Sequence, residues 1–429
     1  MPVFKLRNQV QKYDWGSNSA IPDLLGLENT EQEPMAELWM GAHHKSPSEI
    51  VVNPDSGETR SLLEAIGEDP NGFLGERNAD RFYGRLPFLF KVLSAEHALS
   101  IQAHPTLQEA RHGSQRENAA GIPLDAPHRN YRDANHKPEL LCALTDFWAL
   151  RGFRPLKEIF AEFRNSGWES LNRALIRMEQ EGEPYGVEQF FQTIMESEGS
   201  RKEQLIQQAL KRAEAERTGE GTSIEDYSDP RFYWITVLHE QHPGDIGVLA
   251  PLYLNCFVLH PGQSMYLSPG VLHAYLHGTA LEVLANSDNV LRGGLTSKHI
   301  DLAELLHVVD FRTEEPQIRE ATPVEEDESF RREGEGASVA VYRTDAPEFE
   351  LYRIDCDGAD AVRFERGEQP EVLLCLSGSV EIQTTERDGL GGPESCTLNR
   401  GESCIVTASV AEYRLSGTGR LYRAVVPQS

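Results

Sequence analysis

The sequence from Leu267 to His299, LSPGVLHAYLHGTALEVLANSDNVLRGGLTSKH, sets chemically reactive side chains among apolar runs. A histidine follows a Pro-Gly turn, and two acids, an arginine and a lysine come after it. The intervening runs of Val, Leu and Ala are typical of buried strands. Polar groups placed singly between buried strands are costly unless they are paired or bind a ligand. We therefore expect a functional site in this stretch.

The length and charge of the chain limit the classes of protein to which it can belong. Its 429 residues suggest two or three domains. The 68 acidic residues outnumber the 41 basic ones, for a formal net charge of −27. This balance argues against a nucleic-acid partner and against binding to an anionic membrane surface. No apolar run approaches the ~20 residues of a membrane helix, and the N-terminus lacks the apolar stretch of a signal peptide.

The cysteines indicate the cellular compartment. They show no C-x-x-C spacing and mostly lie in apolar runs, which is typical of buried, reduced thiols in a cytoplasmic protein. A metal site made of thiols is therefore not expected, and we expect a cytoplasmic protein that acts as a monomer. The six cysteines are Cys142, Cys256, Cys356, Cys375, Cys396 and Cys404.

A second pair of polar residues lies upstream of the opening stretch. Between Leu86 and Pro105 two apolar, strand-like runs occur, and the second ends in Gln102-Ala103-His104. Alternate residues of a strand share a face, so Gln102 and His104 project together. Taken alone, such a histidine is more often a hydrogen-bonded core residue.

The segment 111–135 is polar, rich in Gly, Pro, Asp and His, and has no apolar periodicity, which predicts a loop. A loop of this length in a compact domain is usually functional or disordered. It leads to the sequence NHKPE at Asn135–Glu139, where charged residues run directly into an apolar strand. Lys137 and Glu139 could lie at a solvated strand end, or they could accompany Gln102 and His104.

Hydrophobic periodicity indicates a helical insertion. From about residue 155 to 216 the apolar period changes from two to 3.6, as in Leu171, Leu175 and Met178, which would share one helical face. This change of period predicts a group of helices inserted into a β-rich chain. The segment contains no pattern typical of a catalytic or binding site.

The last third of the chain predicts a separate β-domain. Past Leu306 the sequence is acidic and irregular, and the run at 325–328 predicts a solvated linker. From Val339 onward, short strands alternate with Gly-rich turns, which is typical of a small jelly-roll or barrel. This region contains no histidine, so a histidine-based metal site is excluded there.

The residues from Gly262 to His273, GQSMYLSPGVLH, resemble the second signature of cupin barrels, in which a Gly and a Pro-containing turn position a histidine on a strand. In cupins an earlier strand supplies a His-x-His pair and then a carboxylate. Gln102 and His104 would stand for that pair, and Glu139 for the carboxylate. One amide oxygen, two imidazoles and one carboxylate suit a single Zn²⁺ per chain with an open position. The same set would accept Fe, Co or Mn.

Longer stretches resemble the type I mannose-6-phosphate isomerase (phosphomannose isomerase) family, in the family's order and over essentially the whole chain. Because these matches are long, the resemblance is specific. The matching stretches are Tyr13–Gly16 (YDWG), Glu37–Trp39 (ELW), Lys91–Ser94 (KVLS), Leu99–Pro105 (LSIQAHP), Asn135–Glu139 (NHKPE), Ser268–Gly270 (SPG) with His273, and Ser287–Thr296 (SDNVLRGGLT) with Lys298.

The resemblance implies a zinc-dependent, cupin-type enzyme that interconverts mannose 6-phosphate and fructose 6-phosphate. On the family pattern, Arg292 matches the arginine treated as catalytic. A minor departure is Gly293-Gly294, where other members carry Ala-Gly. The residues that match the zinc ligands are Gln102, His104, Glu139 and His273.

Aldose–ketose isomerisation moves a proton between C1 and C2 through an enediol, and a metal ion together with Arg292 could stabilise the negative charge on oxygen. A general acid/base is also required. Alternatively, Glu282 could orient a ligand and Asp288 could form a salt bridge with Arg292. The candidates for proton transfer are His136, Lys137, Glu282 and Asp288.

The phosphate requires cationic or backbone donors, and the sequence shows no Gly-rich phosphate loop. Lys298 and Ser100 are candidates, with Lys91 behind them and Arg292 competing for the role. Tyr275 shares a strand face with His273 and would line the pocket. Trp15, in the YDWG turn, is a further candidate for substrate contact.

Two other classes of function remain open. A metal cupin of another reaction class, such as an epimerase or a dioxygenase, would use similar ligands, but it would not need both Arg292 and Lys137. A non-catalytic cupin that binds sugar phosphates would be expected to lack a ligand or a base, and the sequence retains all of them.

The predicted fold is mainly β with an α-helical insertion, in which a cupin-type jelly-roll barrel carries the site. We assign residues 1–154 and 246–320 to the catalytic barrel and 155–245 to the helical insertion. Residues 321–338 form the acidic linker, and 339–429 form a second, cupin-like β-domain without a metal site.

Overall fold

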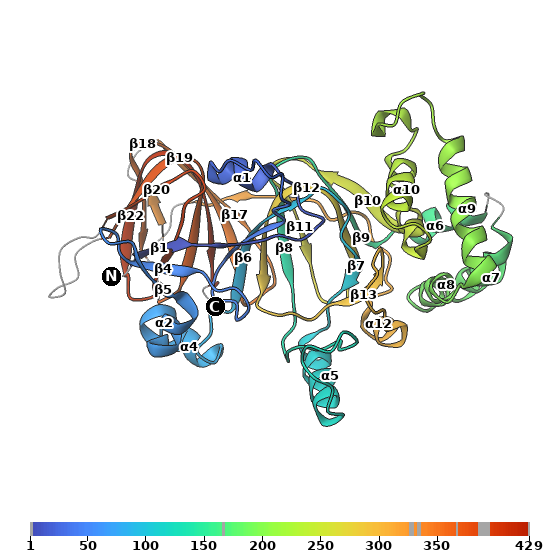
Figure 1. The fold of residues 1–429 in the computed structure, drawn as a ribbon, viewed down its shortest axis with the longest axis horizontal. Coiled ribbons are helices and arrows are strands. Elements are labelled where there is room, and N and C mark those ends of the chain that lie inside the picture. The colour runs from blue at the N-terminus through green and yellow to red at the C-terminus, as the bar shows by residue number, and fades with distance from the viewer. Residues whose placement is uncertain are drawn as a thin grey trace.

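The computed structural model describes residues 3–164, 168–325, 330–332, 336–365, 368–384 and 395–427. Three parts lie in a row, with a C-terminal sheet at one end, a second sheet in the middle and a group of helices, α6 to α10, at the other end (Figure 1). The protein is mainly β with an α-helical insertion, so the predicted fold class is confirmed. No helix within the described ranges is long and apolar enough to cross a membrane.

The middle sheet is antiparallel and curls around a central strand, β12 (His273–Ala285). One part of β12 pairs with β6 and β8, and its first residues pair with β7 and β9, after a register shift between Tyr275 and His277. β12 therefore joins both halves of the barrel. The other strands are β2 (Gln9–Gln11), β3 (Glu37–Met40), β6 (Phe88–Ala95), β7 (Ile101–Ala103), β8 (Glu139–Ala143), β9 (Phe147–Phe153), β10 (Leu254–Leu259), β11 (Gln263–Leu267), β13 (Leu291–Gly294) and β14 (Arg319–Glu320).

Alternation along these strands separates the barrel interior from the outer face. On β12, Leu281 and Val283 pack outward into a core that also contains Val372 and Ile405 of the C-terminal sheet. The residue between them, Glu282, therefore points into the barrel. The same alternation directs Lys91 on β6 and Glu139 on β8 inward. Their neighbours Val92 and Leu140 pack in the core between the barrel and the C-terminal sheet. The fold therefore sends charged residues into the interior of the barrel.

The C-terminal sheet also takes strands from the beginning of the chain. β1 pairs with β21 (Val3 opposite Val406) and with β4 (Leu6 opposite Ile50). The sequence pattern identified these segments as strands but carried no information on their partners. Part of residues 1–154 thus completes the C-terminal sheet. Its strands are β1 (Val3–Arg7), β4 (Glu49–Asn53), β5 (Glu58–Ser61), β15 (Thr322–Pro323), β16 (Phe330–Arg332), β17 (Ala337–Tyr342), β18 (Glu350–Glu365), β19 (Glu371–Thr384), β20 (Ser395–Asn399), β21 (Ser403–Val406) and β22 (Glu412–Val425).

The helical insertion packs on the end of the barrel that β9 and β10 form (Figure 1). Leu171, Leu175 and Met178 are buried in one core together with Leu150 and Ala274 of the barrel, as their helical spacing predicted. The insertion contains α6 (Leu156–Arg164), η1 (Glu169–Leu171), α7 (Asn172–Glu181), α8 (Tyr185–Met195), α9 (Gly199–Ala215), η2 (Ile224–Asp226) and α10 (Pro230–Gln241). The remaining helices are α1 (Ala20–Leu25), α2 (Leu62–Glu68), α3 (Pro70–Leu74), α4 (Glu76–Arg81), α5 (Leu107–Ala119), η3 (Ile246–Leu249), α11 (Ala250–Tyr253) and α12 (Leu302–Val308).

Helix α5 occupies part of the segment that the sequence predicted to be a loop, so that part of the prediction is wrong. Thr106 caps the helix, and its hydroxyl accepts from the backbone N–H of Glu109, whose carboxylate accepts in return from the Thr106 N–H. The buried face consists of small and polar residues, so it shows no apolar period. At Gly113 an added Cβ would lie 2.4 Å from the Tyr131 ring. Close packing on a glycine therefore replaces the apolar stripe.

All six cysteines are free thiols, and four of them are buried. The acidic run predicted as a surface linker lies outside the described residues at 326–328. The short strands β15 and β16 on either side of it pair with β17 and β18 of the C-terminal sheet.

A buried ion pair holds the C-terminal sheet. Arg423 on β22 donates from Nε to Glu371 on β19 at 2.7 Å, and the Glu371 carboxylate also accepts from the Tyr413 hydroxyl at 2.8 Å. The Arg423 guanidinium lies 4.9 Å from the ring centre of Tyr352 and 4.7 Å from that of Phe364. Burial lowers the pKa of Arg423, but Glu371 more than offsets this effect and raises it.

We expect Arg423→Met to destabilise the protein by about 3–5 kcal/mol, because it leaves the Glu371 carboxylate buried without its cation. Urea unfolding followed by circular dichroism measures the change. Arg420→Met is the matched control, since Arg420 lies on the same strand and forms an exposed ion pair with Asp355, for which a loss of about 0–1 kcal/mol is expected. Equal losses in the two variants would contradict the structural role of the buried pair.

Candidate active site

Three strand ends bring two histidines and a glutamate together inside the barrel. His104 follows β7, Glu139 begins β8 and His273 begins β12. The Pro-Gly turn before His273 is tied to the first histidine, because the N–H of Gly270 donates to the His104 carbonyl at 2.8 Å. Gly270 has φ +86°, which a residue with a side chain would rarely adopt. The turn that was read from the sequence therefore fixes the spacing between the two histidines.

The geometry of the three side chains fits a metal ion. Nε2 of His104 lies 3.3 Å from Glu139 Oε1, and Nε2 of His273 lies 3.4 Å from Glu139 Oε2. Neither Nε2 atom has a hydrogen bond within the described structure, although both are buried. Zinc bonds of 2.0–2.2 Å in a tetrahedron require ligand atoms roughly 3.4 Å apart. The three side chains form one of two groups of this kind among the described residues.

The other ring nitrogens orient the imidazoles. Nδ1 of His104 lies 2.7 Å from the Asn289 carbonyl, and Nδ1 of His273 lies 2.9 Å from the Val271 carbonyl. A carbonyl can only accept, so each Nδ1 carries a proton, and in a neutral imidazole Nε2 then presents a lone pair. Backbone acceptors behind the ligands are the usual support of metal-bound histidines.

Electrostatics hold His104 and Glu139 in the protonation states that a bound metal requires. Burial lowers the pKa of His104 to about 4, and the Lys137 ammonium reinforces this shift. Burial raises the pKa of Glu139, but Lys137 and His104 more than offset that effect and hold it well below its usual range. At neutral pH the imidazole of His104 is therefore neutral and Glu139 is ionised.

Gln102, the predicted fourth ligand, lies opposite two site residues at once. It is paired with His273 on β12 and with Arg292 on β13. Residues directly opposite each other in antiparallel strands share a face, so the three side chains form a row across the sheet. Gln102 also lines the cavity next to Glu139. Its coordination of a metal stays a prediction.

A cavity of about 210 Å³ adjoins this group and is lined largely by polar side chains. Tyr275 donates to Glu282 at 2.9 Å and to Glu139 at 3.2 Å. The Lys91 ammonium lies 3.0 Å from Glu282 and 3.3 Å from Glu37. The lining residues are Tyr13, Glu37, Trp39, His43, Lys45, Leu89, Lys91, Leu93, Leu99, Gln102, Lys137, Glu139, Tyr275, Glu282, Leu284, Ser287, Asp288 and Val290.

Burial and neighbouring charges act in opposite directions on the titrating groups of this network. Burial lowers the pKa of Lys91, but Glu282, Glu37 and Glu139 more than offset it and raise the net value. Burial raises the pKa of Glu282, opposed by Lys91 and reinforced by Glu139. Lys91 is thus a cation already neutralised by two carboxylates, and Glu282 holds a proton more readily than an exposed glutamate.

The four candidates for proton transfer lie in different surroundings. Lys137 lines the cavity, with Nζ 2.9 Å from Glu139, and Glu282 faces it from β12. Asp288 also lines it, but its carboxylate pairs with Lys45 at 2.9 Å; the alternative in which Asp288 pairs with Arg292 is therefore wrong. His136 is not among the lining residues. Its Nε2 lies 2.8 Å from Glu348, just before β18.

The candidates for substrate contact also divide. Tyr275 and Lys91 line the cavity. Trp15 is not a lining residue; its ring packs behind Tyr13, with centroids 5.7 Å apart, and Tyr13 is the ring that lines the cavity. Ser100 is half-buried and lies outside the lining set, two residues before Gln102.

A cluster of three cations, Arg132, Arg292 and Lys298, lies near the Gln102 row. Burial lowers the pKa of Arg292, and so does the charge of Arg132. Burial likewise lowers the pKa of Lys298, reinforced by Arg292 and Arg132. Over the described parts of the chain, the side chains of these three residues have no hydrogen bond or ion pair with a carboxylate. Neighbouring cations without a charged partner favour an anionic ligand.

Sequence reasoning missed Arg132, Glu37, Trp39 and Tyr13 as site residues. Arg132 lies in the polar segment before NHKPE, whose proximity to the predicted ligands was the available signal. Glu37 and Trp39 are two apart on β3 and so share a face, and the Trp39 indole donates to Glu37 at 2.7 Å. The link from β3 to the metal ligands passes through Lys91 and Glu282, which no local pattern reveals.

A buried His–Glu–His group inside a β-barrel, beside a polar cavity, defines a metal-binding protein of the cupin type. Residues 3–156 match the family of the phosphomannose isomerase type I catalytic domain. The chain is 38% identical over 420 residues to mannose-6-phosphate isomerase of Salmonella typhimurium, which covers 98% of both chains. This chain belongs to the type I phosphomannose isomerase family.

Solved structures agree over the whole length. A zinc-bound mannose 6-phosphate isomerase aligns with a TM-score of 0.84 and 37% identity, covering 100% of both chains. A lysine-to-alanine mutant of the phosphomannose isomerase from Salmonella typhimurium aligns with a TM-score of 0.85 and 36% identity, again over 100% of both. The helical insertion and the C-terminal sheet are therefore common to these relatives.

The low pKa of His104 makes the stability of the metal-free protein depend on pH. The unfolded histidine has a pKa near 6.5 and the folded one about 4, so below pH ~6.5 the unfolded state binds the extra proton. The free energy of unfolding is unaffected by this group above pH ~6.5. It falls by roughly 3 kcal/mol as the pH is lowered from there to about 4. Urea titrations in chelator from pH 7 to 4 measure this, and His104→Gln should show a shallower slope. Parallel slopes would contradict the assignment.

Proposed function

We propose that this chain interconverts D-mannose 6-phosphate and D-fructose 6-phosphate with one bound Zn²⁺. The observation that carries the proposal is the His104–Glu139–His273 group, whose two unpartnered Nε2 atoms meet beside a cavity lined by ionisable groups. Family membership over 98% of the chain supports the same reaction. A Zn²⁺ ion held by these three side chains, with Gln102 beside them, would supply Lewis acidity for negative charge that develops on a substrate oxygen.

We assign proton transfer to Lys137 and Glu282. Both face the cavity, and Lys137 contacts the ligand Glu139 directly. The raised pKa of Glu282 moves its carboxyl toward the range in which it can release and recover a proton near neutral pH. Tyr275 and Lys91 fix the two oxygens of Glu282, so the carboxyl keeps one orientation. His136 and Asp288 are positioning residues in this scheme, since each is held by a charged partner.

We assign the phosphate to Arg132, Arg292 and Lys298. The phosphate of a sugar phosphate is close to doubly charged at neutral pH, and guanidinium groups bind such oxygens through two parallel hydrogen bonds. Arg292 shares a sheet face with Gln102 and His273, so a substrate anchored at Arg292 extends toward the metal ligands. Ser100, two residues from Gln102, is a further candidate for contact with the substrate.

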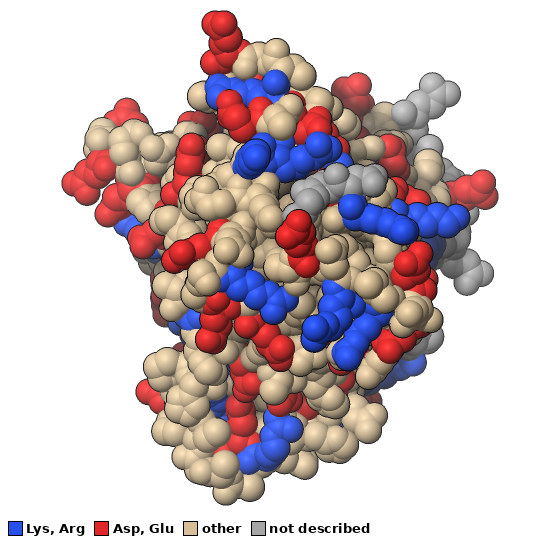
Figure 2. All heavy atoms as spheres, turned by 90° about the vertical axis from the view of Figure 1, so that its right-hand side faces the viewer, with Lys and Arg blue, Asp and Glu red and all other residues tan. Residues whose placement is uncertain are grey.

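We also propose that the protein acts as a monomer in the cytoplasm. Its domain division is the one predicted above, except that β1, β4 and β5 belong to the C-terminal sheet. Its free thiols support a reducing compartment. On the face that carries the helical insertion, acidic and basic side chains are interspersed rather than gathered by sign (Figure 2). This mixed surface supports a small-molecule substrate rather than a polyanionic partner.

Purified protein should interconvert the two sugar phosphates, lose activity on chelation and regain it when Zn²⁺ is returned. The coupled assay for fructose 6-phosphate measures this in one direction. Mannose without phosphate is the control, and it should react far more slowly because it lacks the group that the basic cluster binds. Absence of activity in a folded, zinc-loaded sample would reject the isomerase proposal and leave the binding-module or other cupin functions.

Arg132→Ala should raise KM about ten- to a hundred-fold, the loss expected for a charge-assisted hydrogen bond, with a smaller change in kcat. The inhibition constant of inorganic phosphate should rise in parallel. Arg312→Ala is the matched control, because Arg312 is an exposed arginine that pairs with Asp310. An unchanged KM in Arg132→Ala would remove this residue from the phosphate site.

A further inference from the structure

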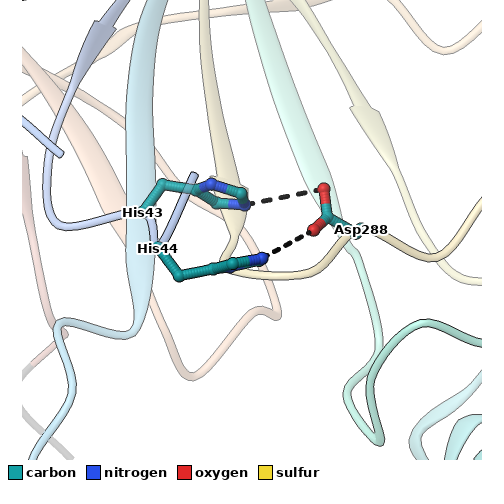
Figure 3. A group of neighbouring side chains, drawn as sticks. All are labelled: His43, His44 and Asp288. Carbon is teal, nitrogen blue, oxygen red and sulfur yellow. Dashed lines mark ion pairs between the residues drawn. The ribbon is translucent and has the colours of Figure 1, made fainter. Parts of the chain in front are cut away.

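A second group of metal-ligating side chains lies at the cavity, apart from the ligands described above. His43 and His44, on the turn after β3, both point toward Asp288 in the segment between β12 and β13 (Figure 3). Nε2 of His43 lies 3.6 Å from Oδ1 of Asp288, and Nε2 of His44 lies 3.6 Å from Oδ2. The two imidazole rings are 4.6 Å apart at their centres. All three ligand atoms lie within 4.8 Å of one another.

This spacing is close to that of the first group. The nitrogen–oxygen distances there are 3.3 and 3.4 Å, and roughly 3.4 Å is the separation that a tetrahedral zinc site imposes. A contraction of a few tenths of an ångström would bring His43, His44 and Asp288 to the same spacing. The donor set is two imidazoles and one carboxylate, which favours Zn²⁺, Co²⁺ or Ni²⁺ over Mg²⁺ and Ca²⁺.

Two of the three ligands are held in place by the fold. The N–H of Asp288 donates to Asp133 at 2.7 Å, which fixes the backbone that carries the carboxylate. The His43 ring is buried and meets the edge of Trp39 with centroids 4.8 Å apart. The third ligand, His44, is exposed, with 66% of its side chain accessible. A bound ion would therefore keep open positions toward bulk solvent.

We propose that His43, His44 and Asp288 form a second, weaker site for a divalent transition-metal ion, and that Lys45 competes with the ion for this site. The proposal concerns metal binding only and stands apart from the reaction assigned to the first group.

Lys45 contacts both kinds of ligand. The Lys45 ammonium lies 2.9 Å from Oδ2 of Asp288, and the backbone N–H of Lys45 donates to Nδ1 of His43 at 3.3 Å. Coordination through Nε2 would place the ring proton on Nδ1, where it would face the Lys45 N–H. A divalent ion would also repel the ammonium. The Lys45 side chain is 44% accessible and so has room to withdraw. Occupation of the site therefore requires Lys45 to leave Asp288, which weakens the binding of an ion here.

Calorimetric titration of the metal-depleted full chain with Zn²⁺ tests the proposal. Unmodified protein should bind one ion tightly and a second more weakly. His44→Ala should lose the weaker event and keep the tight one, and because His44 is exposed, its removal spares the core. His273→Ala should show the reverse. Co²⁺ absorption gives an independent readout, because its visible bands report the coordination of each bound ion.

Two further variants discriminate this site from adventitious binding to surface histidines. His260→Ala is the matched control, because His260 is an exposed histidine that faces a single carboxylate, Asp146, at 2.8 Å; it should retain both binding events. Lys45→Met removes the competitor and should tighten the weaker event by about five-fold, leaving the tight one unchanged. The proposal would be overturned if His44→Ala still bound two ions, or if Lys45→Met bound the second ion no more tightly than the unmodified protein.

Discussion

The structure depends on one buried carboxylate, that of Glu139, which is 1% exposed. An isolated ion at such a depth is unstable by several kcal/mol, so its neighbours must compensate it. Lys137 lies 2.9 Å away, and Tyr275 donates at 3.2 Å. The imidazoles of His104 and His273 complete the surroundings. These groups lie on or next to β7, β8 and β12. The site therefore forms only if these strands pair in the observed register.

The network of charged groups that begins at Glu139 carries a net negative charge, which favours a bound cation. Tyr275 and Lys91 link Glu139 to two more carboxylates, Glu282 and Glu37. Three carboxylates thus face two ammonium groups, those of Lys91 and Lys137, so this network has one more negative charge than positive charges. A divalent ion among the ligands would reverse that sign. Together with the unpaired basic cluster, it would make the cavity attractive to an anion, although the chain carries a net charge of −27.

Local chemistry explains which parts of this architecture could be predicted from the sequence. The Pro-Gly turn before His273 and the alternation of Gln102 with His104 are short-range patterns, and the structure places Gln102 on β7, His104 directly after it and His273 at the start of β12. Helix α5 escaped because its buried face is built on Gly113 and polar groups rather than on an apolar stripe. The pairing of β1 with β21 escaped because alternation identifies a strand without its partner. Distant partners such as Glu348 for His136 escaped for the same reason.

The two sheets satisfy a buried glutamate in opposite ways. In the C-terminal sheet, Glu371 receives the guanidinium of Arg423 from a neighbouring strand and the hydroxyl of Tyr413, so its charge is met within the chain. In the barrel, the imidazoles beside Glu139 turn their Nε2 atoms toward the carboxylate, and lone pairs that converge on a carboxylate repel it unless a cation lies between them. An arginine therefore makes one buried carboxylate structural, whereas two histidines make the other a metal ligand. The absence of histidine from residues 339–429 is consistent with this division of labour.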